Sequence, residues 1–453
     1  MEDAVVRLIS MGLGNFKNVG QGNIKFQTQI LGIYGQNGSG KTAVIDALGF
    51  LKNILEGKPL PSDAAEFIMK PAEQANCSFQ FHIQDASTEY LVDYEFGIQK
   101  STEFGVEIVQ ERLSEKHGSG NDLTAKSLLF EYLSTNTEEL FTPKNRWKSI
   151  SGQTKSTPID LGVAKKLVQK ERRSFLFSKE FLNVLKPLQE QESCALSVLG
   201  ALHRFAFTNL FVVRNNCNSP VSLDLILPFN FKHLESEKLS LGCMGISLRE
   251  PTLVSDKPFQ LLGQLLQEMN IVMDKLVPGL SLEIKDHGLQ QTPNGEDGHR
   301  MELLTSRNGQ KIPLCYESEG IKKIISILSI LIAVYNKPST CLVVDELDSG
   351  VFEYLLGEIL QIMEENGKGT LIFTSHNLRP LEMIRKESLI FTTTNPAERY
   401  IRMSGVKTNN NLRDLYLRSI NLGGQKEPVY QATNPFELSQ AFRKAGTIDN
   451  EKD

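Results

Sequence analysis

Eight residues near the N-terminus have the types and the spacing of a loop that holds nucleotide phosphates. They fit the pattern G-x-x-x-x-G-K-[ST] and are Gly35, Gln36, Asn37, Gly38, Ser39, Gly40, Lys41 and Thr42. Glycines let backbone N–H groups turn toward phosphate oxygens, and a helix that begins at such a loop adds the partial positive charge of its N-terminus. We expect Lys41 to reach the β- and γ-phosphates and the Thr42 hydroxyl to bind Mg²⁺.

The residues on either side supply the strand and the helix that such a loop requires. Residues 30–34 form a short apolar run of strand character, and residues 43–51 are apolar and helix-forming. A glycine-rich turn that matched the pattern by accident would not need this context. The sequence therefore predicts a binding site for ATP with Mg²⁺.

Two further apolar runs end in side chains that could complete a hydrolytic site. Residues 341–344 precede Asp345 and Glu346, and residues 370–375 precede His376. Parallel strands of an α/β sheet present their carboxyl ends at one edge, where ligands bind. We expect Asp345 to bind Mg²⁺, Glu346 to polarise the attacking water as a general base, and His376 to orient that water or sense the γ-phosphate. The alternatives are two acids on a surface turn and a structural histidine.

A serine stands just before the most apolar helical pattern of the chain. Ser318 can cap a helix over residues 321–334, and the free N–H groups of its first turn would form a second anion site. The alternative is a capped core helix that binds no ligand.

Composition excludes several classes of protein. Hydrophobic residues make up 40% and charged residues 23% of the 453, as in ordinary globular proteins. The net charge of −5 gives no overall basic field, so contact with nucleic acid would need a local patch. The six cysteines lie far apart without a C-x-x-C pair, which is typical of reduced thiols. The apolar run 324–334 is too short to cross a membrane, and the N-terminus lacks a signal-peptide core, so we expect a cytoplasmic protein with no membrane partner.

The order of these patterns predicts an α/β protein in three parts. Residues 1–160 read as an N-terminal lobe that holds the phosphate loop and an antiparallel sheet. Residues 161–280 read as an inserted helical arm, in which Pro187 should end or kink a helix. Residues 281–453 read as a second lobe with the capped helix, the two acids and the histidine.

A basic stretch, residues 165–173, lies near the start of this helical arm. Glu171 is its only acid, and its basic residues are Lys165, Lys166, Lys170, Arg172 and Arg173. A solvated helix face is the simpler interpretation. Contact with nucleic acid or a partner is the alternative, although no interleaved aromatic residues support base stacking.

The order of phosphate loop, inserted arm, capped helix, strand with two acids and strand with histidine resembles that of the ABC-type ATPases. Within that family the chain is most similar to the SMC/RecF/OLD-like branch, over roughly residues 5–150 and 280–420. The resemblance implies an ABC-type head with a mixed or parallel core sheet, an antiparallel β subdomain and an inserted helical arm. Phe16 and Lys17 resemble the early strand and loop of this branch and are expected near the base or the phosphates.

The resemblance also implies an ATP site that two subunits share. Ser318 and Gly320 correspond to the signature that meets the ATP of another subunit, Asp348 to the acid of the connecting loop, and His376 to the switch. The signature here is Glu-Ser-Glu-Gly instead of LSGGQ. The glutamine loop of the family has no decisive counterpart among Gln74, Gln80, Gln84 and Gln169.

Stand-alone ATPases of bacterial anti-phage defence, such as the ATPase component of PARIS systems and the Septu type, resemble this chain best and act with a separate effector. The residues after His376 contain no D-x-D pair, paired histidines or Cys/His cluster, so we expect no intrinsic nuclease. We therefore expect an ATPase that forms at least a homodimer through its ATP sites and acts as a scaffold or sensor for a separate effector protein. The alternative is a RecF-like DNA-binding ATPase of repair or recombination, which leaves nucleic acid open as a partner. A transporter motor is disfavoured by the large insertion.

Overall fold

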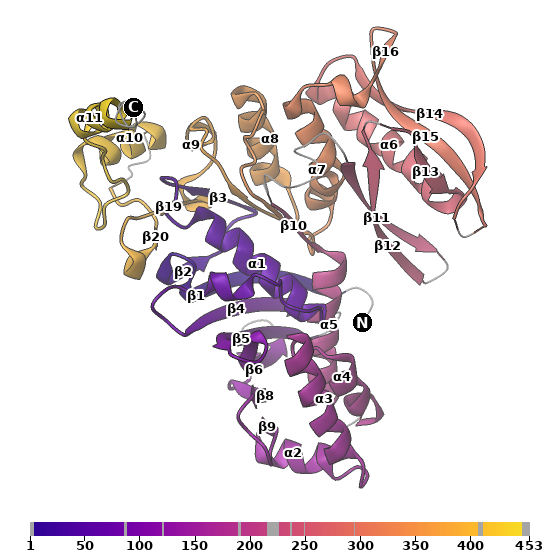
Figure 1. The fold of residues 1–453 in the computed structure, drawn as a ribbon, viewed down its shortest axis with the longest axis vertical. Coiled ribbons are helices and arrows are strands. Elements are labelled where there is room, and N and C mark those ends of the chain that lie inside the picture. The colour runs from indigo at the N-terminus through magenta and orange to yellow at the C-terminus, as the bar shows by residue number, and fades with distance from the viewer. Residues whose placement is uncertain are drawn as a thin grey trace, which may run out of the picture.

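The computed structural model of the chain describes residues 4–85, 88–119, 122–188, 192–214, 226–235, 238–248, 250–293, 295–405 and 411–445. Figure 1 shows helices and sheets arranged around a central layer of short strands. Among the described residues, none of the helices combines the length and the hydropathy that a membrane-spanning segment requires.

The central sheet is mixed and is built from short apolar strands. Parallel strands are joined through crossovers that place helices on both faces, so their side chains are buried on both sides. All neighbouring strands are parallel except β19 and β20. The spatial order is β10 (Leu210–Val213), β17 (Cys341–Val344), β18 (Thr370–Thr374), β3 (Ile30–Tyr34), β19 (Leu389–Thr392) and β20 (Tyr400–Ile401).

Helices cover both faces of this sheet and the ends of the molecule. The α-helices are α1 (Lys41–Leu55), α2 (Lys144–Ser151), α3 (Thr157–Glu171), α4 (Lys179–Leu185), α5 (Ser193–Thr208), α6 (Asp256–Leu276), α7 (Glu319–Asn336), α8 (Glu353–Asn366), α9 (Pro380–Met383), α10 (Leu412–Leu422) and α11 (Pro435–Ala445). The short 3₁₀ helices are η1 (Ala64–Phe67), η2 (Lys186–Leu188), η3 (Leu314–Tyr316), η4 (Lys386–Ser388) and η5 (Pro396–Glu398).

Alternate side chains of the central strands enter two different cores. Leu31 and Ile33 of β3 pack with α1 and α5, whereas Ile30 and Tyr34 pack with α7, α8 and α10. This follows from the two-residue period of a strand, which sends successive side chains to opposite faces. The phosphate-loop helix α1 and the capped helix α7 therefore lie on opposite faces of the sheet.

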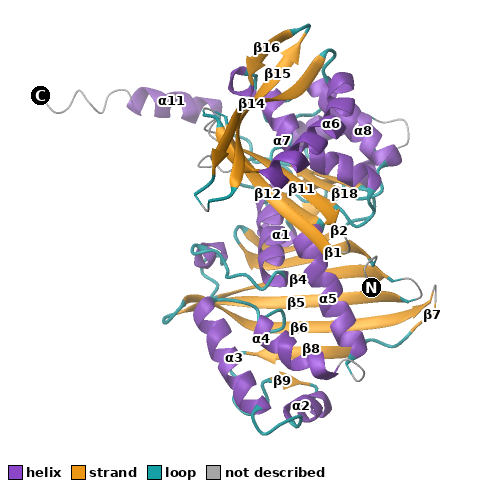
Figure 2. Cartoon of the chain, turned by 90° about the vertical axis from the view of Figure 1, so that its right-hand side faces the viewer, coloured by secondary structure: helices purple, strands orange, loops and turns teal. Residues whose placement is uncertain are grey.

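A large antiparallel sheet lies beyond α1 and α5. Figure 2 shows α5 crossing in front of its strands, and the rings of Phe81 on β4 and Phe205 on α5 are 6.1 Å apart. The strands in spatial order are β2 (Val19–Lys25), β1 (Val5–Phe16), β4 (Gln74–Gln84), β5 (Glu89–Ser101), β6 (Gly105–Ser119), β8 (Ser127–Leu133) and β9 (Phe141–Thr142), with β7 (Asp122–Leu123) beside β6. The expected α/β class with a mixed core and an antiparallel subdomain is confirmed.

Residues 161–280 differ from the expected helical arm, because they contain strands as well as helices. The apolar run Leu210–Val213 is strand β10 and pairs with β17 in the central sheet. A short apolar run directly after a helix has no period that distinguishes strand from helix, so the sequence pattern hides this strand. Pro187 does follow the end of a helix, since α4 stops at Leu185. The three-part division of the chain stays a prediction.

The rest of this segment forms a third core with the residues that follow it. Helix α6 packs against a second antiparallel sheet and against α7. That sheet contains β13 (Thr252–Ser255), β15 (Asp297–Arg307), β14 (Leu280–Gln291) and β16 (Gln310–Pro313), and a separate hairpin is formed by β11 (Ile226–Glu235) and β12 (Lys238–Ser247). Helix α7 thus contributes to the second core and to the third.

The described cysteines match the expected pattern of free thiols. Cys77 and Cys341 are buried, and Cys194 and Cys315 are half-buried. The remaining two, Cys217 and Cys243, have side chains outside the described part of the structure.

Candidate functional site

The phosphate loop runs between the end of β3 and the start of α1, as the sequence predicts. Gly35, Gly38 and Gly40 have φ angles of 152°, 74° and 99°, which other residues rarely adopt. At Gly35 a Cβ atom would also lie only 1.7 Å from Thr392 Oγ1 of β19. The close contact with the neighbouring strand therefore requires glycine at this position.

The N-terminus of α1 has the features of an anion-binding site. Among the described residues, no side chain caps this helix, and its first turn carries no acid. Lys41 Nζ donates hydrogen bonds to the carbonyl oxygens of Gly35 at 2.7 Å and Gln36 at 3.1 Å, so the ammonium group lies within the loop. Burial lowers the pKa of Lys41, and the nearby carboxylates of Asp345 and Glu346 oppose that shift. An ammonium group beside free helix N–H groups is suited to phosphate.

The separate motifs line one cavity of about 620 Å³. This volume is typical of a small-molecule binding site. The acids follow β17 and the histidine follows β18, and these two strands lie beside β3 in the central sheet. Their carboxyl ends consequently meet at the phosphate loop. The residues of the prediction that line the cavity are Asn37, Gly38, Gly40, Lys41, Thr42, Asp345, Glu346 and His376.

The two acids are held by one buried hydroxyl group. Thr374 Oγ1 donates to Asp345 Oδ1 at 2.6 Å and accepts the Glu346 N–H at 2.7 Å. Glu346 itself has a φ of 47°, a left-handed conformation that is uncommon for residues other than glycine and often found at functional sites. Burial raises the pKa of Asp345, and the neighbouring Glu346 raises it further.

Asp348 holds the backbone that carries the histidine. Its Oδ2 accepts hydrogen bonds from the N–H groups of His376 and Asn377, both at 3.0 Å. The His376 side chain is exposed at the edge of the cavity. Asp348 therefore contacts its own chain here, and its expected role in a contact between subunits stays a prediction.

Ser318 and Gly320 lie at the start of α7. Ser318 Oγ accepts the Ile321 N–H at 3.4 Å, which is the capping contact that the sequence predicts. Gly320 lies against the connecting loop, because an added Cβ would be 1.9 Å from the Gly350 carbonyl oxygen. Neither residue is among the described residues that line the cavity of the same chain.

The cavity also contains residues that the motifs do not reveal. Lys17 lines it and is paired with the buried Asp46 of α1, whereas Phe16 is fully buried in the core. Glu66 of η1 and Met69 and Lys70, which follow η1, also line it. The Met69 N–H donates to Asn15 O at 2.8 Å, so the fold brings this segment back to the end of β1. No local sequence pattern marks a contact of that kind.

A second unexpected contact joins the phosphate loop to the C-terminal part of the chain. The Gln36 side chain donates to the Gln431 carbonyl at 3.3 Å and accepts the Gln431 N–H at 3.0 Å. Ser39 Oγ is also hydrogen-bonded to Thr392 Oγ1. The loop is thus fixed from both β19 and the segment that precedes α11.

Comparisons with known proteins agree with a nucleotide-binding domain. Residues 10–210 match a protein-family model described as an AAA domain. A comparison with curated proteins finds no match to the sequence.

Solved structures with a similar fold include two SMC heads and one RecF. An SMC head bound to the C-winged helix domain of ScpA has 12% identity and a TM-score of 0.38, over 88% of this chain and 98% of that one. The SMC head domain from Thermotoga maritima has 16% identity and a TM-score of 0.38, over 88% and 99%. The recombination mediator RecF with ATP has 13% identity and a TM-score of 0.33, over 82% and 94%.

Proposed function

We propose that this chain binds and hydrolyses ATP with Mg²⁺ and acts as an ATP-gated scaffold or sensor for a separate effector in bacterial anti-phage defence. The observation that supports the ATPase activity is the cavity in which the phosphate loop meets Asp345, Glu346 and His376. The AAA-domain match over residues 10–210 agrees with it. The role in defence rests on the sequence resemblance alone.

The described residues suit each part of the reaction. The Asp345 carboxylate and the Thr42 hydroxyl offer the oxygen ligands that Mg²⁺ prefers, and a bound Mg²⁺ would offset phosphate charge. Lys41 neutralises the β- and γ-phosphates. Glu346 accepts the proton of the attacking water, and His376 donates a hydrogen bond to that water or to the γ-phosphate.

We further propose that a second copy completes the site through Ser318 and Gly320. The surface around Ser318 carries exposed aromatic side chains: Tyr316 is 77% exposed, Phe352 68% and Tyr354 50%. The rings of Phe352 and Tyr354 stack with centroids 5.6 Å apart. Exposed aromatic residues are enriched at protein interfaces, which supports a contact with a second copy on this surface.

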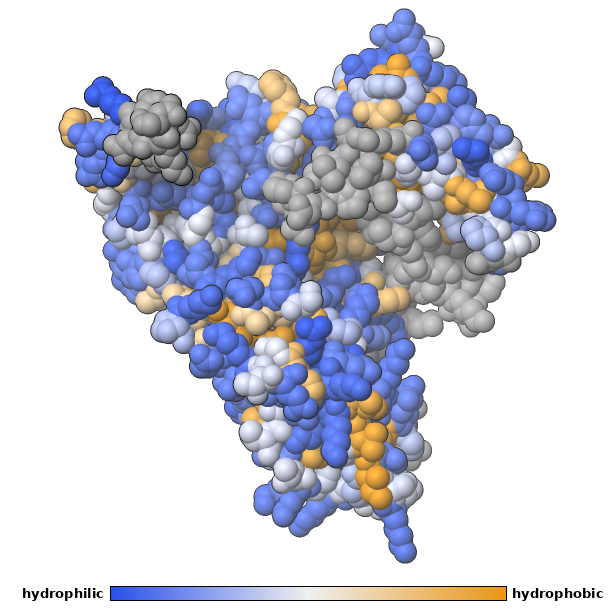
Figure 3. Space-filling model, viewed as in Figure 1, coloured by the Kyte–Doolittle hydropathy of each residue, from blue (hydrophilic) through white to orange (hydrophobic). Residues whose placement is uncertain are grey.

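Two helices away from the ATP site support contact with an effector. On α3, Ile159, Val163 and Leu167 recur every four residues and are 67%, 51% and 37% exposed. Figure 3 shows an apolar streak over the helices at the narrow end of the molecule. Helix α11 extends from the body in Figure 2, with Phe436 and Phe442 69% and 73% exposed. A partner bound there would be gated by ATP only if it preferred one nucleotide state.

The basic stretch over residues 165–173, at the end of α3 and just after it, gives little support to the DNA-binding alternative. Lys165 Nζ donates to Asn136 O, and Arg173 pairs with Glu171 and Glu180. Part of the positive charge is therefore neutralised or engaged within the chain. Steeply salt-dependent binding of duplex DNA, with ATPase activity stimulated by the duplex, would favour that alternative.

Mixing two inactive variants tests whether the site is shared. Lys41→Ala removes the ammonium group that contacts the phosphates, and Ser318→Arg blocks the signature surface that would meet the ATP of a second copy. A forced heteromer of the two would contain one intact composite site, so it should recover part of the wild-type hydrolysis rate. Each variant alone, with its fold checked by circular dichroism, is the control. No recovery in folded heteromers would show that the site is complete within one chain.

A cleavage assay tests the need for a separate effector. The purified protein should leave DNA and RNA intact with ATP and either Mg²⁺ or Mn²⁺. Robust cleavage that a point mutation outside the ATP site abolishes would overturn the proposal of a separate effector, while leaving the ATPase assignment in place.

A further inference from the structure

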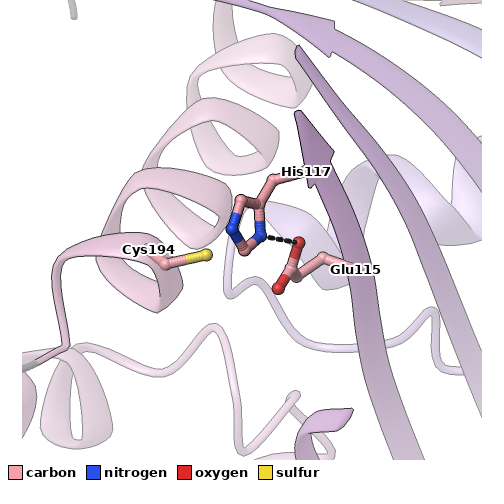
Figure 4. Close-up of side chains that lie close together, drawn as sticks. All are labelled: Glu115, His117 and Cys194. Carbon is pink, nitrogen blue, oxygen red and sulfur yellow. Dashed lines mark hydrogen bonds and ion pairs between the residues drawn. The ribbon is translucent and has the colours of Figure 1, made fainter. Parts of the chain in front are cut away.

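Three side chains with metal-binding atoms converge between the antiparallel sheet and α5, away from the ATP cavity. They are Glu115 and His117 of β6 and Cys194 of α5, and one ligand atom from each lies within 4.8 Å of the others. Glu115 and His117 are two positions apart, so a strand presents them on the same face. Figure 4 shows all three side chains pointing toward one another.

We propose that Glu115, His117 and Cys194 bind a divalent cation of the zinc type. A thiolate, an imidazole and a carboxylate are all common zinc ligands, whereas Mg²⁺ and Ca²⁺ prefer oxygen ligands alone. Bond lengths of about 2.0–2.3 Å from a tetrahedral ion need only a modest closure of the present cluster. Three protein ligands leave the fourth position for water.

The charges at the cluster favour a cation. The Glu115 side chain is only 3% exposed, and its recorded ion-pair partner is the ring of His117, at 2.9 Å, which is charged only when protonated. Arg146, whose charge also acts on Cys194, makes its recorded contacts with other groups: its Nε lies 3.1 Å from Glu192 and its Nη1 donates to Leu129 O. A buried carboxylate without a permanent cation is costly, and a bound ion would remove that cost.

The position of the cluster indicates what the ion would do. Cys194 lies in the first turn of α5, and α5 leads directly into β10 of the central sheet. Entry from solvent is open, since the His117 side chain is 45% exposed. The ion would thus fix the start of α5 to β6 and stabilise the contact between the antiparallel sheet and the central sheet.

Titration of the metal-free full-length protein with Zn²⁺ tests the site. We expect one high-affinity equivalent by calorimetry and a rise in melting temperature. Replacing single ligands, in Cys194→Ser and His117→Gln, should weaken binding at least tenfold. Cys315→Ser is the matched control, because it removes another half-buried thiol outside the cluster and should bind Zn²⁺ like the wild type.

Co²⁺ provides a second measurement that does not depend on stability. A thiolate ligand gives a sulfur-to-cobalt charge-transfer band, which should appear in the wild type and be absent from Cys194→Ser. Retained binding of ATP by the variants would show that they fold. The proposal would be overturned if the wild type bound no stoichiometric Zn²⁺, or if Cys194→Ser bound Zn²⁺ as tightly as the wild type. The three side chains would then form a hydrogen-bonded structural cluster.

Discussion

A single buried hydroxyl orients both acids of the candidate site. Thr374 is fully buried at the end of β18, and its oxygen contacts the Asp345 carboxylate and the Glu346 backbone N–H. Because β18 lies between β17 and β3, this contact also links the acids to the strand that carries the phosphate loop.

Thr374→Val keeps the shape of this side chain and removes its hydrogen bonds. We expect slower ATP hydrolysis with a smaller change in ATP affinity, because the acids are misplaced while the phosphate loop is intact. Loss of the two hydrogen bonds of the Thr374 hydroxyl should also lower the free energy of unfolding by about 1–3 kcal/mol. Steady-state kinetics measure the hydrolysis rate and the apparent affinity for ATP, and urea denaturation measures the free energy of unfolding. Thr370→Val, at the other end of β18, is the control, and equal effects of the two variants would contradict the assigned role.

At the scale of elements, the start of α7 depends on a contact between two glycines. Gly320 lies against Gly350, so Gly320→Ala would force the helix away from the connecting loop. We expect a loss of at least about 1 kcal/mol of unfolding free energy, together with lower ATPase activity.

Gly263→Ala in α6 is the matched control, because nothing lies within 4 Å of a Cβ there. It should stabilise the protein by about 0.5–1 kcal/mol, as expected for alanine in a helix interior. Urea denaturation compares the two variants, and a neutral or stabilising effect of Gly320→Ala would show that the contact is not tight.

A buried carboxylate connects the antiparallel sheet to the turn before α4. Glu111 on β6 accepts hydrogen bonds from Tyr94 Oη at 2.7 Å, Ser174 Oγ at 2.5 Å and the Phe175 N–H at 2.6 Å. Burial nevertheless raises its pKa above the ordinary value of 4.5. The folded protein thus keeps a proton at pH values where the unfolded chain has released it.

The free energy of unfolding should therefore fall as pH rises from 4.5 through the raised pKa of Glu111. Glu111→Gln has no such titration, so its stability should lack this decline. Urea denaturation at a series of pH values measures the slope, and Glu95→Gln on the exposed side of β5 should keep the wild-type slope. Parallel curves for the wild type and Glu111→Gln would show that Glu111 titrates normally.

Sequence reasoning succeeds where the functional residues are contiguous. The phosphate loop and the ends of β17 and β18 each combine an apolar strand with the polar residues that follow it, so local patterns suffice. Lys70 and Gln431 reach the site only because distant segments fold back onto it. The sequence pattern places strand β10 in a helical arm, since a short apolar run next to a helix has no distinctive period.

For the whole molecule, α7 connects the second core to the third, and Ser318 at its start is the residue that we propose meets the ATP of a second copy. Its residues Ile327 and Leu331 pack in the core beneath the central sheet, while Ile324 and Leu328 pack with α6 and β14. A ligand held at the Ser318 end of α7 would therefore act on both cores. Under the proposal of a shared site, ATP bound between two copies would thus act on the packing of α7 against α6 and β14.

The central claim is that Glu346 activates water for ATP hydrolysis beside the phosphate loop. The most direct test compares ATP binding and steady-state hydrolysis in the wild type and Glu346→Gln, with Glu358→Gln on the exposed side of α8 as the control. We expect Glu346→Gln to bind ATP and to hydrolyse it at least about a hundredfold more slowly, while the control keeps the wild-type rate. An unchanged hydrolysis rate in Glu346→Gln would contradict the account.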